Sequence, residues 1–86
     1  MKKFIVKMMI STYKGAKHYY EEASETDDQD AKRVFKDLAM GETAEFDKLC
    51  HLYMHKTEHG VIEHDYWLEH FKEEVLEIRK KIAELT

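Results

Sequence analysis

Two carboxylates, Glu42 and Glu45, occupy positions of a predicted helix where apolar side chains are expected. The segment from about Ala31 to Tyr53 is amphipathic, and its seam positions follow one another at intervals of three and four residues without a break. A buried ionised carboxylate is costly unless a metal ion, a cation, a shared proton or water compensates it. Glu42 and Glu45 are therefore the candidate metal ligands. The predicted seam consists of Ala31, Phe35, Leu38, Glu42, Glu45, Leu49 and Leu52.

The composition predicts a single all-α domain that comprises residues 1–86, because proline is absent and glycines are only three. We expect helices at about Lys3–Ser24, Asp28–Thr57 and Val61–Leu85, joined by short turns, with Gly60 ending the second helix. The expected seam of the first helix is Ile5, Met9, Thr12, Ala16, Tyr19 and Ala23. That of the third is Leu68, Phe71, Val75, Ile78, Ile82 and Leu85.

The small size of the chain favours an assembly. A domain of 86 residues buries a modest core, and Cys50 is its one cysteine, so no intrachain disulfide is available. Three helices could close on themselves, or two helical hairpins could pair across a two-fold axis. We expect the second arrangement, a homodimeric four-helix bundle, because it stabilises a small core more.

Charge and hydropathy exclude several classes of partner. The net charge of −4 argues against nucleic acid and against anionic membranes. The apolar N-terminal stretch is interrupted by Lys7 and is too short to span a membrane, so we read it as the start of a helix. We expect a cytoplasmic protein.

The segment from Gly15 to Leu49 resembles the rubrerythrin branch of the ferritin-like di-iron superfamily. The resemblance lies in Gly15, Tyr19, the run Tyr20-Glu21-Glu22-Ala23, a polar turn, and the stretch from Ala31 to Glu42. It covers under half of the chain. It implies a ferritin-like helical hairpin that belongs to a four-helix bundle. It also implies ligands of the form Glu on one helix and Glu-x-x-His on the next, with di-iron chemistry on peroxide or oxygen, or iron handling.

The chain departs from this ligand pattern at two positions. Glu42 matches the glutamate of Glu-x-x-His, but Glu45 stands in place of the histidine, and Lys14 stands in place of the first-helix glutamate. The third helix contains no Glu-x-x-His. The resemblance therefore implies ancestry and fold more than activity.

Two arrangements could compensate Glu42 and Glu45. Counting along the helices from the two turns places Lys14 and Arg79 nearest to Glu42, and an opposite charge at about 4 Å contributes roughly 4 kcal/mol before desolvation. Alternatively, four glutamates from two copies could hold two divalent cations. Their all-oxygen set suits Mn, Mg, Ca or Fe better than Zn or Cu.

Other side chains have simpler interpretations. His51, His55 and His59 recur every four residues, and we expect an exposed stripe at which His51 and His55 could bind adventitious Zn or Ni. Cys50 has no activating motif and is expected to be an inert, half-buried thiol. Tyr13, Tyr19 and Tyr20 are expected to line the core.

The functional hypothesis is a rubrerythrin-like protein with an altered di-iron site that retains divalent metal binding, with Fe or Mn as the cofactor, through Glu42 and Glu45. If such a protein is an enzyme, it is an iron-dependent oxidoreductase. The alternative is a non-catalytic helical scaffold or interaction module without a cofactor, in which a salt bridge from Glu42 to Lys14 or Arg79 replaces the metal. Neither substrate nor redox partner follows from the sequence.

Overall fold

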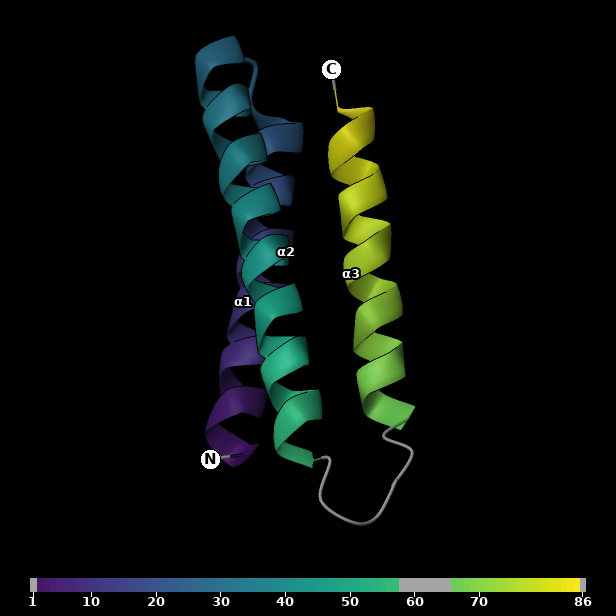
Figure 1. Cartoon of the computed structure of the whole chain (residues 1–86). Helices are drawn as coiled ribbons and strands as arrows, with labels where there is room; N and C mark the ends of the chain where they lie inside the picture. Colours follow the sequence, from purple (N-terminus) through teal and green to yellow (C-terminus); the bar gives the residue numbers. More distant parts are fainter. Residues whose placement is uncertain (1, 58–65, 86) are drawn as a thin grey trace.

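The computed structural model describes residues 2–57 and 66–85, which form three helices. They are α1 (Lys2–Glu25), α2 (Gln29–Thr57) and α3 (Tyr66–Glu84). The middle helix runs antiparallel to the other two (Figure 1). In Figure 1, α1 and α2 form a long hairpin, and α3 runs beside them. The all-α expectation is confirmed for these residues. The predicted Gly60 stop and the predicted helical start at Val61 lie outside them.

The turn between α1 and α2 is built by side chains that the sequence marks as helix caps. The carboxylate Oδ1 of Asp28 accepts hydrogen bonds from the backbone N–H groups of Asp30, at 2.9 Å, and Ala31, at 3.2 Å. The hydroxyl of Thr26 accepts the N–H of Asp28 at 3.2 Å. These contacts satisfy donors that the first turn of a helix leaves without partners. Asp28 is therefore the N-cap residue of α2.

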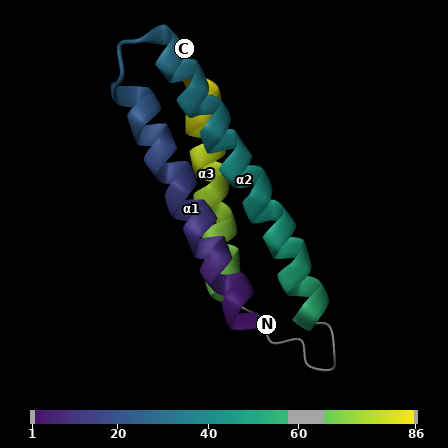
Figure 2. The ribbon, with the colours of Figure 1, turned by 90° about the vertical axis from the view of Figure 1, so that its left-hand side faces the viewer.

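The α3 helix lies in the groove between α1 and α2. Figure 2 shows the hairpin in front and α3 behind it. The ammonium group of Lys36, in the first half of α2, donates a hydrogen bond to the backbone carbonyl of Leu85 at 2.8 Å. Tyr13 of α1 donates one to the carboxylate of Glu74 at 3.3 Å and packs edge-on against Phe71. One face of the hairpin is thus covered by α3, and among residues 2–57 and 66–85 no other helix covers the opposite face, which we call the open face (Figure 2).

The core has two parts along the bundle. Larger side chains fill the part near the start of α1, and small side chains with two isoleucines fill the other. The seams predicted for α1 and α3 are confirmed, because all their members are buried or half-buried. The first part contains Ile5, Met9, Phe46, Cys50, Tyr53, Leu68 and Val75, and the second contains Ala16, Ala39, Ile78 and Ile82.

The seam predicted for α2 is wrong in part: Ala31, Phe35, Glu42 and Leu49 are half-buried, but this seam is not the most buried stripe of the helix. Its buried residues are Ala39, Thr43, Phe46, Cys50 and Tyr53. Leu38 and Leu52 are instead 43% and 40% exposed, and Glu45 is exposed. The predicted stripe therefore lies along one edge of the buried one. It borders the open face of the hairpin rather than the core.

No helix in the described ranges, 2–57 and 66–85, is long and apolar enough to cross a membrane.

Candidate functional site

Glu42 lies at the border between the α1–α2 contact and the open face. It is half-buried, and its side chain packs against Gly15 of α1. A Cβ atom at position 15 would lie 3.0 Å from both Cδ and Oε2 of Glu42. A glycine inside a helix predicts close approach of a neighbouring backbone, but the atoms nearest Gly15 belong to the Glu42 side chain. Glycine at this position leaves the space that the carboxylate fills.

The protonation of Glu42 is perturbed by its surroundings. Burial raises the pKa of its carboxyl group above the ordinary value of 4.5, and the negative charge of Glu45 raises it further. Glu45 is one helical turn away and is exposed. Both effects oppose the ionised form of Glu42. A cation close to the pair would oppose them and favour that form.

The structure does not bring the predicted cations to Glu42. Within residues 2–57 and 66–85, Glu42 forms no ion pair with Lys14 or Arg79. The Lys14 side chain is exposed. Arg79 lies at the expected level along the bundle, but it contacts the side of α2 that faces α3, whereas Glu42 lies on the other side. Arg79, one of the two possible charge partners of Glu42, instead forms a salt bridge with Asp47.

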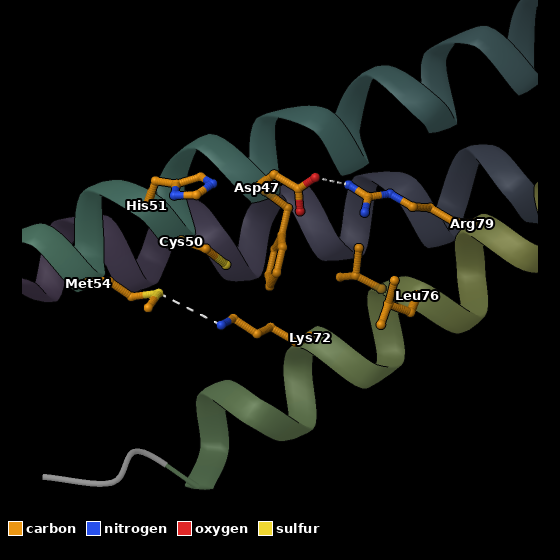
Figure 3. A pocket seen from close by; sticks show the side chains of 9 residues that line it. Asp47, Cys50, His51, Met54, Lys72, Leu76 and Arg79 are labelled. Atoms are coloured by element: carbon orange, nitrogen blue, oxygen red, sulfur yellow. Dashed lines mark hydrogen bonds and ion pairs between the residues drawn. The ribbon is translucent and has the colours of Figure 1, made fainter.

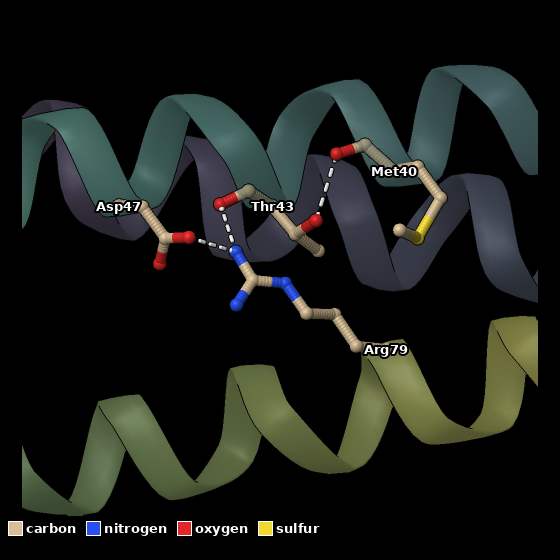
Figure 4. A network of polar contacts seen from close by, with 4 residues as sticks. All are labelled: Met40, Thr43, Asp47 and Arg79. Atoms are coloured by element: carbon tan, nitrogen blue, oxygen red, sulfur yellow. Dashed lines mark hydrogen bonds and ion pairs between the residues drawn. The ribbon is translucent and has the colours of Figure 1, made fainter.

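Arg79 joins α3 to α2 through two acceptors, as Figure 4 shows. Its guanidinium donates a hydrogen bond of 2.8 Å to the backbone carbonyl of Thr43 and a short one to the carboxylate of Asp47. The hydroxyl of Thr43 donates to the carbonyl of Met40 at 2.7 Å, so this buried polar side chain is also satisfied. The sequence predicts Arg79 beside Glu42, whereas the structure places its guanidinium against Asp47, one helical turn after Thr43.

The histidine stripe is exposed where it is described. His51 and His55 both lie at the surface of α2, as expected, and His59 lies outside the described residues. Across the described residues, no three side chains of His, Cys, Asp or Glu converge as a metal site. Any metal site that uses Glu42 and Glu45 must therefore take further ligands from outside this set.

A cavity between α2 and α3 was not anticipated from the sequence. It has a volume of about 200 Å³ and is shown in Figure 3. Cys50 lies in its wall and is more buried than expected, with 6% of its surface exposed. Burial raises the pKa of this thiol to about 11, so it is protonated at neutral pH. The lining residues are Phe46, Asp47, Cys50, His51, Met54, Lys72, Val75, Leu76 and Arg79.

The predicted tyrosines line the helix contacts. Tyr13 is half-buried between α1 and α3, and burial, followed by the charge of Glu74, raises the pKa of its phenol. Tyr19 stacks on Phe35, with ring centroids 6.4 Å apart. Tyr20 packs against the core part that contains Ile78 and Ile82. These contacts agree with a packing role.

Comparison of the chain with protein-family models, curated proteins and solved structures found no match. The functional argument therefore rests on the residues and their geometry.

Proposed function

We propose that the chain is a ferritin-like helical protein that binds divalent metal, iron or manganese, between two copies of itself. Each copy contributes Glu42 and Glu45. The observation that carries this proposal is the position of these acids at the middle of an uncovered apolar face. Such a face favours association, and two facing acidic pairs at its centre need a cation.

The open face is the side of the hairpin away from α3. Helical spacing places Leu38, Glu45 and Leu52 on the side of α2 opposite Asp47 and Met54, which approach α3. The same reasoning places Phe4 and Met8 of α1 on this face. Phe4 is 63% exposed, and Met8, Leu38 and Leu52 are each at least 40% exposed. Large apolar side chains gathered on one face are typical of a protein interface.

A two-fold axis near Glu42 would bring the two open faces together. The hairpins of both copies would then form a four-helix arrangement, with α3 of each copy on the outside. The apolar side chains on both sides of the acids would pack against the partner copy. The axis would also place four carboxylates in one layer.

The donor chemistry of that layer fits a hard divalent cation. Carboxylate oxygens suit Fe, Mn, Mg or Ca. Within residues 2–57 and 66–85, one chain supplies two carboxylates at this position, so in this proposal a second copy completes the ligand set. The metal would oppose the two causes that raise the pKa of Glu42, burial first and then the negative charge of Glu45. The residues of this chain would hold the metal and exclude bulk water around it with the flanking apolar side chains.

The decisive experiment measures bound metal and mass together. Untagged protein is loaded with Fe(II) or Mn(II) under anaerobic conditions, desalted and analysed by elemental analysis and light scattering. We expect a dimer with stoichiometric metal, and a loss of metal in Glu42→Ala. Glu73→Ala, which removes an exposed glutamate of α3, is the matched control and should bind as the wild type does. Wild type that retains no metal after loading would refute the proposal.

The second candidate function is a metal-free helical interaction module. It is favoured by the finding that residues 2–57 and 66–85 of one chain do not assemble three metal ligands. In that case the open face would bind a partner, and Glu42 would be protonated or hydrated there. A dimer that forms equally well with chelator and with metal, and carries no metal, would select this candidate.

A further inference from the structure

The cavity between α2 and α3 has an apolar floor and a charged rim. Phe46, Cys50 and Val75 are buried and form the floor, and Leu76 borders it from α3. Its volume of about 200 Å³ is smaller than the 300–1,000 Å³ that is typical of sites for drug-sized molecules. The cavity is on the α3 side of α2, away from Glu42 and Glu45. It is therefore separate from the proposed metal layer.

The charge at one end of the cavity is not balanced by a carboxylate. In Figure 3 the Lys72 side chain extends from α3 towards Met54 of α2. Its hydrogen-bond partner is the thioether of Met54, at 3.8 Å. A thioether is a weak, uncharged acceptor. Within the part of the chain that the structure describes, Lys72 forms no ion pair.

At the other end of the cavity the positive charge is paired. Arg79 is bound there by the Asp47 carboxylate and by the carbonyl of Thr43. Because the Asp47 charge offsets that of Arg79, the lining carries one uncompensated positive charge, at Lys72, when His51 is neutral. The cavity thus combines an apolar floor with a single cationic group at its opening.

We propose that this cavity binds a small monocarboxylate with a hydrocarbon body, of the size of a short-chain fatty acid. The carboxylate would accept hydrogen bonds from Lys72, and the hydrocarbon would lie on Phe46 and Val75. Two cationic side chains in the lining disfavour a metal cation. A neutral apolar molecule would leave Lys72 without a charged partner. One cation matches a single carboxylate better than a dianionic phosphate.

Hexanoate is the probe for the first experiment. ¹⁵N-labelled protein is titrated with sodium hexanoate at constant ionic strength, and hexan-1-ol and hexylammonium are titrated in parallel. We expect saturable chemical-shift changes confined to residues of α2 and α3 around the cavity. Hexanol, which lacks the charge, should bind at least about tenfold more weakly, and hexylammonium should not bind. Equal binding of hexanol and hexanoate would overturn the proposal.

Two lysine variants test the charged group. Lys72→Met retains an unbranched apolar side chain and removes the ammonium, and it should weaken hexanoate binding about tenfold or more. Lys80→Met makes the same change at an exposed position of α3 that does not line the cavity. It should leave the affinity unchanged. Equal affinities for hexanoate in the two variants would remove Lys72 from the site and contradict the proposal.

Cys50 reports on occupancy in the unaltered protein. It is the one cysteine of the chain and lies in the cavity wall. At pH 9, saturating hexanoate should slow the alkylation of Cys50 by iodoacetamide, whereas hexylammonium should leave the rate unchanged. An unchanged alkylation rate in hexanoate, or cavity resonances that shift on protein dilution and not with hexanoate, would overturn the proposal. The second result would show that another copy of the chain occupies the cavity.

Discussion

The Glu42 carboxylate lies in the space that Gly15 leaves by having no side chain. A Cβ atom at position 15 would be 3.0 Å from Glu42 Oε2, whereas one at Gly41 would meet no atom within 4 Å. Both glycines lie within helices, at positions where glycine is less favourable than alanine. Gly15 therefore positions Glu42, and Gly41 does not have a comparable contact.

Gly15→Ala should lower the pKa of Glu42 without lowering the stability of the fold. The new methyl group pushes the end of the Glu42 side chain towards solvent, so the pKa of Glu42 should fall towards 4.5. The variant should be as stable as the wild type, or more stable by up to about 1 kcal/mol, because alanine is the better helix former. Carbon-detected NMR titration of the carboxyl groups and urea unfolding measure the two effects.

Gly41→Ala is the matched control for this substitution. Its higher helix propensity should stabilise the fold by a similar amount, about 1 kcal/mol. The pKa of Glu42 should not change, because a Cβ atom at position 41 has no neighbouring atom within 4 Å. If both variants change the Glu42 pKa equally, the contact with Gly15 does not hold Glu42 in place.

Glu42→Gln should stabilise the metal-free protein at neutral pH. The folded-state pKa of Glu42 is raised, so the folded chain binds more protons than the unfolded chain at pH values from about 4.5 up to the folded pKa. The wild type consequently loses stability as the pH rises through this window, and above it the ionised carboxylate is a constant cost. Glutamine does not titrate. Its stabilising effect should therefore be present at pH 7 and be smallest at about pH 4.

Unfolding by urea at several pH values, in the presence of a chelator, measures this difference. Glu73→Gln, at an exposed glutamate of α3, is the control. A Glu42→Gln effect of the same size at pH 4 and pH 7 would show that ionisation of Glu42 is not its cause.

Much of the fold follows from periodicity and capping, but the rotation of α2 does not. The buried seams of α1 and α3 and the Asp28 cap agree with the sequence because each of these helices has one dominant apolar stripe. In α2 two stripes lie side by side, one through Phe46 and one through Leu38, and both have helical spacing. Periodicity cannot decide which of them faces α1 and α3, since that depends on contacts with other helices.

The contacts of the candidate site residues also depend on helix packing that sequence periodicity does not determine. The level of Arg79 along the bundle was predictable from the turns, but the side of α2 that it contacts depends on how α3 lies in the groove. Asp47 is therefore its partner rather than Glu42. The cavity was not predictable for the same reason, because it is formed by side chains of α2 and α3 together. The contact between Gly15 and Glu42 likewise depends on how α1 and α2 pack.

The two stripes of α2 should differ sharply in their contribution to stability. Phe46 is 1% exposed, so Phe46→Ala should cost about 3–5 kcal/mol through lost burial and an unfilled cavity. Leu38 is half-exposed in the single chain, and Leu38→Ala should cost about 1 kcal/mol or less when the protein is dilute and monomeric. Urea unfolding over a range of protein concentrations measures both. A cost for Leu38→Ala that grows with concentration would agree with the proposed dimer face. An equal cost for both variants in dilute protein would contradict the orientation of α2.

Arg79 should stabilise the fold more through its hydrogen bond to the Thr43 carbonyl than through its ion pair with Asp47. Asp47 is 51% exposed, so its ion pair with Arg79 is screened by solvent, and Asp47→Asn should cost less than about 1 kcal/mol. Arg79 is 27% exposed and also donates to the Thr43 carbonyl, so Arg79→Met should cost about 1–2 kcal/mol. Lys80→Met controls for the loss of a positive charge on α3. Urea unfolding of the single variants and of the Asp47→Asn/Arg79→Met double variant gives the coupling energy of the pair. If Asp47→Asn cost as much as Arg79→Met, the ion pair rather than the carbonyl contact would anchor this part of α3, contrary to the prediction.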